Sequence, residues 1–217
     1  MTHDVDIEPT RLLLVRHGES TSNHQGVISG WSTDVTLTER GRRQAERTAQ
    51  TLGRMATIAA LYSSPLPRAW ETATIIGGVI GLSPIHVDDL REINVGIAVG
   101  QPLVDLTSLY PQLQSQVGRE SLHIPWPDGE SHAQLRERAM RAVETIVTAH
   151  PGKTVVAVAH GGPLAWIITT LASDDVGTFQ TWRHGNCAIS ELLVRPSQTG
   201  LSAELIRFND RAHLDGV

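Results

Sequence analysis

The sequence predicts an α/β fold: a three-layer α/β/α sandwich with a mostly parallel central sheet and helices on both faces. One observation is the run from Leu12 to Val15, which is short, continuous and apolar, as is typical of a strand buried on both faces. A second is the β-branched run from Val155 to Ala159. A third is that such strands alternate with longer helical stretches, a pattern typical of a parallel sheet with helical crossovers.

Each expected element rests on a local pattern. Thr38 before Glu39 is a typical helix start, Ser131 caps the longest helix, and Pro163 lies near a helix start, where proline is tolerated. The expected strands, which are short apolar runs, are 11–16, 57–63, 154–159, 187–194 and 203–208. The expected helices, in chain order, are 38–53, 66–81, 104–116, 131–149 and 162–171.

The chain is expected to form one domain. It has 217 residues, enough for a substantial core, and no repeat, low-complexity tract or linker divides it. We therefore expect a single domain over residues 1–217, with residues 1–10 as a flexible N-terminal tail. The least regular region runs from Gln101 to Gly129.

Histidine and arginine follow the predicted strands at their carboxyl ends, where open α/β sheets place their ligand crevices. Arg16 and His17 end the first strand, His160 ends the strand at 154–159, and each histidine precedes glycine. Arg68 follows the strand at 57–63 and falls in the first turn of the helix predicted at 66–81. The helix dipole disfavours a cation there unless an anion binds too. Arginine donors match phosphate oxygens, and histidine can act as a nucleophile or proton carrier. The pattern favours phosphate chemistry.

Several motifs resemble the histidine phosphatase superfamily, which includes cofactor-dependent phosphoglycerate mutases and many small-molecule phosphatases. The resemblance spans roughly residues 11 to 210 and implies a phosphoglycerate mutase-like fold. The motifs are LLLVRHGES at 12–20, Asn23, LTERGRRQA at 37–45, SSPLPRA at 63–69, LREI at 90–93, GES at 129–131 and VAHGG at 158–162.

The resemblance implies a role for each strand-end residue. His17 matches the nucleophile that takes the phosphoryl group as a phosphohistidine. Arg16, Arg68 and His160 match the donors around the phosphate, and two arginines with a histidine suit a dianion. Nearby arginine charges also help to keep His17 neutral, as a nucleophile must be. Satisfied core histidines and a surface arginine are the structural alternatives.

The resemblance also implies roles for residues further along the chain. Glu92 matches the proton donor to the leaving oxygen, although a glutamate beside Arg91 also fits a solvated ion pair. Asn23 matches a phosphate-binding position and could equally cap a turn. The remaining expected site residues are Gly161 at the phosphate, and Glu19 and Arg138 behind the contact residues, where Glu19 orients Arg16 or caps a turn and Arg138 pairs locally.

The chain departs from the family pattern after Glu92. Many members carry an aromatic-Gly-x-Trp-Glu-Gly stretch, whereas this chain reads Val95-Gly96-Ile97-Ala98-Val99-Gly100. The glycines are kept, but the aromatic residues and the second acid are absent. This change is the one sequence feature that favours an inactive or very selective member.

Three functions are consistent with these residues. The first is a phosphoric monoester hydrolase that acts on a small-molecule phosphate without a metal. The second is a cofactor-dependent phosphoglycerate mutase, which the absence of a basic, proline-rich middle segment disfavours, while SLYP at 108–111 and HIPWPDGES at 123–131 resemble the phosphatase branch. The third is a non-catalytic phospholigand-binding protein, which would not need both a nucleophile and an acid.

Composition limits cofactors, partners and location. The formal charge of −5 lacks the basic footprint of a nucleic-acid-binding protein. The polar N-terminus and the lack of a long apolar run predict neither a signal peptide nor a membrane partner. The single cysteine, Cys187, predicts a cytoplasmic protein with a small core thiol. The ten histidines show no close metal-ligand spacing, so we expect no metal or cofactor, and either a monomer or a homodimer.

Overall fold

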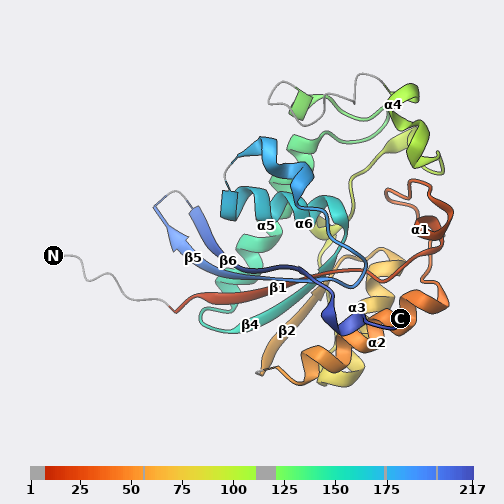
Figure 1. Ribbon diagram of the computed structural model, residues 1–217. Coiled ribbons are helices and arrows are strands. Elements are labelled where there is room, and N and C mark those ends of the chain that lie inside the picture. The colour runs from red at the N-terminus through yellow and green to blue at the C-terminus, as the bar shows by residue number, and fades with distance from the viewer. Residues whose placement is uncertain (1–7, 56, 111–120, 174, 199) are drawn as a thin grey trace.

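A computed structural model describes residues 8–55, 57–110, 121–173, 175–198 and 200–217. Its centre is a six-stranded sheet of order β3-β2-β4-β1-β5-β6, with helices on both faces (Figure 1). The predicted fold class is confirmed. The strands are β1 Thr10–Arg16, β2 Ile58–Ser63, β3 Ile85–His86, β4 Thr154–Ala159, β5 Ile189–Ser197 and β6 Gly200–Asp210. The α-helices are α1 Thr21–Gln25, α2 Glu39–Gly53, α3 Pro67–Ile80, α4 Leu106–Leu109, α5 His132–Ala149 and α6 Gly161–Ile168.

The sheet is parallel except for one strand. β1 pairs in parallel with β4, β4 with β2 and β2 with β3, whereas β5 runs antiparallel to both β1 and β6. The register places Arg16 opposite Ala159 and Ser63 opposite Val158. The residues that follow β1, β2 and β4 therefore lie together at the carboxyl ends of these neighbouring strands.

The apolar core fills both sides of this sheet, because successive side chains of a strand point to opposite faces. Leu12 and Leu14 pack with residues of α5 and α6, whereas Leu13 and Val15 pack with residues of α2 and α3. Figure 1 shows these two helix pairs on opposite faces of the sheet. A strand covered in this way reads as a continuous apolar run.

The helix starts follow the predicted caps. The side chain of Thr38 accepts the N–H of Gly41 at the start of α2, and Ser131 forms a capping box with Gln134 at the start of α5. Both arrangements satisfy N–H groups that have no partner inside the helix.

The two strands near the C-terminus differ from the prediction. β5 begins at Ile189 because Cys187 lies in a turn with a φ of 54°, where its N–H donates to the carbonyl of Arg16. β5 and β6 also run beyond residues 194 and 208, since they pair with each other as a long hairpin. The two-residue strand β3 was not expected.

The predicted helix at 104–116 is confirmed only in part within its described residues. A 3₁₀ turn, Leu103–Asp105, leads into the single turn of α4, and Tyr110 is not helical. Tyr110 precedes a proline, which steers the residue before it away from helical angles. Residues 111–120 lie outside the described part of the chain. The predicted helix at 162–171 corresponds to α6, followed by a π-helical turn at Thr169–Ser173.

The expected N-terminal tail overlaps the sheet. β1 already begins at Thr10, whose side chain is buried, and residues 1–7 lie outside the described residues. Among the helices of the described residues, none combines the length and the apolar character needed to cross a membrane.

Candidate active site

Four of the predicted site residues meet at the carboxyl ends of the parallel strands. His17 follows β1 and His160 follows β4, and their ring centroids lie 5.1 Å apart. Arg16 is the last residue of β1, and Arg68 is the second residue of α3, which follows β2. His17, Arg68 and His160 are buried, so the alternative of a surface arginine at Arg68 does not hold.

The ring of His17 is oriented by its own backbone. Its Nδ1 lies 2.7 Å from the carbonyl oxygen of Gly18, which can only accept, so Nδ1 carries the proton and Nε2 has the lone pair. Burial, and then the charges of Arg68 and Arg16, hold the pKa of His17 well below its usual value. The ring is therefore neutral, and the lone pair of Nε2 is available. Gly18 itself is required, since a Cβ there would lie 2.4 Å from the carbonyl oxygen of Gly41.

The two arginines are anchored by carbonyl groups and retain free donors. Arg16 donates to the carbonyl of His184 at 2.6 Å, and Arg68 donates to that of Gly30 at 2.9 Å. Burial lowers the pKa of Arg68 to about 10, which leaves it cationic at neutral pH. Within the described residues, four buried side-chain polar atoms have no partner: Arg16 Nε, Arg68 Nε, His160 Nδ1 and Trp126 Nε1.

Three of these four atoms belong to the predicted site residues Arg16, Arg68 and His160. Buried donors without a partner are costly, and each needs an explanation. The Nε2 of His160 lies 2.8 Å from the hydroxyl of Ser64, which accepts the N–H of Leu66 and can donate to this nitrogen. A neutral His160 ring then carries its proton on the unpartnered Nδ1. The site thus offers three unpaired donors to an anion.

Glu92 reaches the site from an irregular segment. One carboxylate oxygen, Oε1, accepts the N–H of Ile93 at 2.9 Å and that of Gly162 at 3.1 Å. A Cβ on Gly162 would lie 2.3 Å from this oxygen, which explains the second glycine of the HGG motif. Arg91 pairs with Asp88 at 2.7 Å, so the alternative of a solvated Glu92–Arg91 pair does not hold.

The capping role predicted for Asn23 is confirmed, and its phosphate-binding role stays a prediction. It is the third residue of α1, and its Oδ1 accepts the N–H of Ser20 in a capping box. The same oxygen accepts from Asn186 Nδ2 at 3.0 Å. With Oδ1 occupied twice, the NH₂ group of Asn23 is the end that can donate to a ligand.

Sequence reasoning missed the segment from His184 to Cys187. The carbonyl of His184 accepts the bond from Arg16, and Asn186 Nδ2 donates to the carbonyl of His17 at 3.1 Å. These residues lie 168 and 169 positions from their partners, and no local pattern indicates such pairs. The one available signal is a polar His-Gly-Asn run before an apolar strand.

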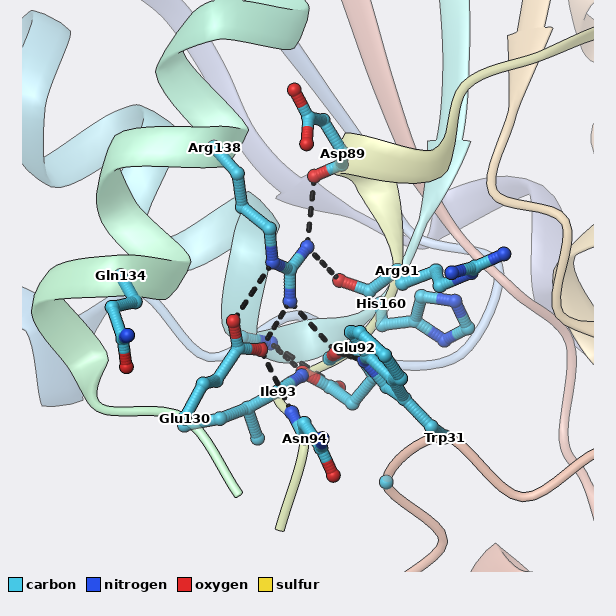
Figure 2. Close-up of polar contacts among 12 residues, drawn as sticks. Trp31, Asp89, Arg91, Glu92, Ile93, Asn94, Glu130, Gln134, Arg138 and His160 are labelled. Atoms are coloured by element: carbon cyan, nitrogen blue, oxygen red, sulfur yellow. Dashed lines mark hydrogen bonds and ion pairs between the residues drawn. The ribbon is translucent and has the colours of Figure 1, made fainter. Parts of the chain in front are cut away.

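The remaining predicted residues lie around this centre. Glu19 binds Thr38 and Arg40 at the start of α2 and has no described contact with Arg16. Gly161 is the first residue of α6, where helix N–H groups lack partners inside the helix. Arg138 contacts the backbone near Glu92 (Figure 2).

The altered stretch after Glu92 forms a 3₁₀ turn at Gly96–Ala98. Val95 and Ala98 pack against Trp126, whereas Ile97 and Val99 are exposed. Separately, no group of three or more metal-ligating side chains occurs among the residues that the structure describes.

The chain belongs to the histidine phosphatase superfamily, branch 1, whose family model matches residues 12–206. A probable phosphoglycerate mutase, GpmB, of Yersinia pestis is 34% identical over 208 residues, covering 94% of this chain and 95% of that protein. The structure of a mycobacterial glucosyl-3-phosphoglycerate phosphatase with VO3 is 28% identical, with a TM-score of 0.80 over 93% of this chain and 99% of that one. An Entamoeba histolytica phosphoserine phosphatase, solved with 3-phosphoglyceric acid, is 27% identical, with a TM-score of 0.80 over 94% and 99% of the two chains.

Proposed function

We propose that the protein is a metal-independent phosphatase that hydrolyses a small-molecule phosphomonoester through a phosphohistidine on His17. One observation carries the proposal: a buried, neutral histidine with a free Nε2 lies among three buried donors that lack partners. A phosphate dianion would satisfy these donors, and the arginine charges would offset its burial. The phosphatase names of two structural relatives, one solved with the oxyanion VO3, support the same reading.

In the first step, Nε2 of His17 attacks phosphorus while the ester P–O bond breaks on the opposite side. Arg16, Arg68 and His160 stabilise the charge on the phosphoryl oxygens. Glu92 gives its proton to the leaving oxygen, which departs as an alcohol. Oε2 is the oxygen that carries this proton, since Oε1 accepts two backbone N–H groups at 2.9 and 3.1 Å, whereas Oε2 accepts only the longer bond from Gly162 at 3.4 Å.

In the second step, water attacks the phosphohistidine. The Glu92 carboxylate takes a proton from that water, the P–N bond breaks, and phosphate leaves with His17 neutral again. No redox or metal step is needed. The single buried thiol of Cys187 also supports a cytoplasmic location, which we include in the proposal.

A phosphoglycerate mutase is the second candidate, favoured by the name of the Yersinia relative. Such an enzyme would return the phosphoryl group to a phosphoglycerate rather than to water. The same nucleophile and donors would serve both reactions, so only the fate of the phosphoryl group separates them.

The test is to incubate the protein with EDTA and p-nitrophenyl phosphate or a panel of metabolite phosphates, and separately with 3-phosphoglycerate plus bisphosphoglycerate. Release of inorganic phosphate in EDTA is the expected result. Interconversion of phosphoglycerates with little phosphate release would replace the phosphatase proposal with the mutase. If neither activity is detected, the result would favour a binding protein.

A further inference from the structure

A buried ion pair binds the backbone around Glu92, the proposed proton donor. Arg138, in the second turn of α5, pairs with Glu130 at 2.5 Å, and both side chains are nearly inaccessible to solvent. Figure 2 shows the guanidinium between Glu130 and the segment that contains Glu92. Burying two charges is costly unless the pair is fully hydrogen-bonded.

Every donor of Arg138 is used within this pair and segment. Nε and NH2 bind the two oxygens of Glu130, NH1 binds the carbonyls of Asp89 and Arg91, and NH2 also binds the carbonyl of Glu92. A guanidinium has five N–H donors, and five bonds are formed. Arg138 therefore has no donor left for a phosphate, and its target is the backbone.

Glu130 fixes the other side of the same segment. Its Oε1 accepts the N–H of Asn94 at 2.8 Å, and its own N–H donates to the carbonyl of Asn94. The backbone is thus held just before and just after Glu92. The segment has no strand or α-helix of its own there, so these bonds replace the ladder that positions His17 and His160.

We propose that the Glu130–Arg138 pair is a positioning device for proton transfer, holding the 89–94 backbone so that the carboxyl of Glu92 faces the leaving oxygen. The inference rests on the proposed function, because it gives Glu92 the role of acid. Arg138 and Glu130 are positioning residues and do not touch the substrate. Their effect should depend on how much the leaving group needs a proton.

The test compares two substrates in Arg138→Met. An alkyl phosphate, the best of the metabolite panel, needs its leaving oxygen protonated, whereas p-nitrophenolate leaves without a proton. We expect kcat/KM, which reports the steps up to the phosphohistidine and not the later step in which Glu92 acts as a base, to fall about 30-fold on the alkyl phosphate and less than about threefold on p-nitrophenyl phosphate. The ~30-fold loss is smaller than the ~10²–10⁴-fold expected when a general acid is removed outright, because the carboxyl group is displaced but still present. Glu92→Gln should show the same selectivity with a larger loss.

The double variant Arg138→Met/Glu92→Gln should be no slower on the alkyl phosphate than Glu92→Gln alone, since both changes act through one carboxyl group. Arg138→Lys should rescue little, because an ammonium cannot serve five acceptors. Arg141→Met is the matched control: it is on the same helix and binds the exposed side chain of Asp89 rather than the backbone. It should leave both rates unchanged.

Equal losses on both substrates, or additive losses in the double variant, would show a merely structural pair and overturn the inference. Glu130→Gln, which keeps the side-chain volume, gives the same test if Arg138→Met does not fold, with a smaller selective loss expected. If Glu92→Gln itself shows no leaving-group selectivity, then the role of Glu92 in the proposed function fails. Selectivity in Glu92→Gln without selectivity in either pair variant would overturn the inference alone.

Discussion

In the proposed mechanism the site has a phosphate side and a leaving-group side, and the two are held in different ways. His17 and His160 each follow a strand directly, so the hydrogen-bond ladder of the sheet fixes their positions. Glu92 follows a short 3₁₀ turn. Its segment of backbone is held instead by the side chains of Arg138, in α5, and of Glu130, just before α5. The phosphate side inherits the rigidity of the sheet, whereas the leaving-group side depends on a few long-range bonds. Substitutions should therefore separate phosphate binding from proton transfer.

The largest effect is expected for the nucleophile. His17→Asn should lower phosphate release on every substrate by at least about 10⁴-fold, because the covalent intermediate of the proposed mechanism forms on His17. Rapid acid-free quenching with labelled substrate should trap a phosphoprotein in the unsubstituted enzyme and none in the variant. A labelled phosphoprotein in His17→Asn would place the nucleophile elsewhere.

A methyl group on Gly162 should disturb the leaving-group side alone. The added Cβ would lie 2.3 Å from Glu92 Oε1, so the carboxyl must move. Gly162→Ala should lower kcat/KM about 10²-fold on alkyl phosphates and far less on p-nitrophenyl phosphate. Gly78→Ala, where an added Cβ meets nothing within 4 Å, is the control and should keep full activity. Similar losses on both substrates would mean that the two sides are not separable.

Asn186→Ala should disturb the phosphate side without leaving-group selectivity. The substitution removes the bonds to the carbonyl of His17 and to Asn23 Oδ1. These bonds orient the proposed nucleophile and Asn23, which is predicted to donate a hydrogen bond to the phosphate. We expect inhibition by vanadate to weaken about tenfold, equivalent to ~1.4 kcal/mol, with a similar rate loss on both substrates. Unchanged vanadate inhibition would remove Asn186 from the site.

The smallest effect on activity is expected for His132, the first residue of α5, whose ring packs against Trp166 of α6 and against Phe179. Burial lowers its pKa to about 4, and Trp166 donates to its Nδ1 at 3.0 Å, so the folded protein holds it neutral. The unfolded chain takes up a proton near pH 6.5, so this contribution to stability is complete above that pH and is lost as the pH falls toward 4.

Denaturant unfolding from pH 7 to pH 4.5 measures this contribution. Near pH 5, His132→Gln should reduce the slope of the free energy of unfolding against pH by about 1.4 kcal/mol per pH unit. The rates on both substrates should stay unchanged at neutral pH. An unchanged slope would mean that His132 titrates normally in the folded protein.

Much of the fold and site could be predicted from local sequence. Leu12 to Val15 are apolar at every position because helices cover both faces of β1, and Thr38 and Ser131 mark helix starts through bonds to residues three positions away. His17, Arg68 and His160 were predicted because each stands directly after a strand or at the start of the next helix. The resemblance was needed for Glu92, which has no such local signal.

The tertiary structure alone decided which distant groups support these residues. Arg16 is anchored by His184, Asn23 by Asn186, and the backbone of Glu92 by Arg138, all through contacts between segments far apart in the chain. The antiparallel direction of β5 and the turn at Cys187 also emerged only in three dimensions. Buried runs and helix caps depend on neighbours within one turn or strand, so the sequence records them. A hydrogen bond between distant segments exists only once the sheet order has brought them together, and no periodic pattern encodes it.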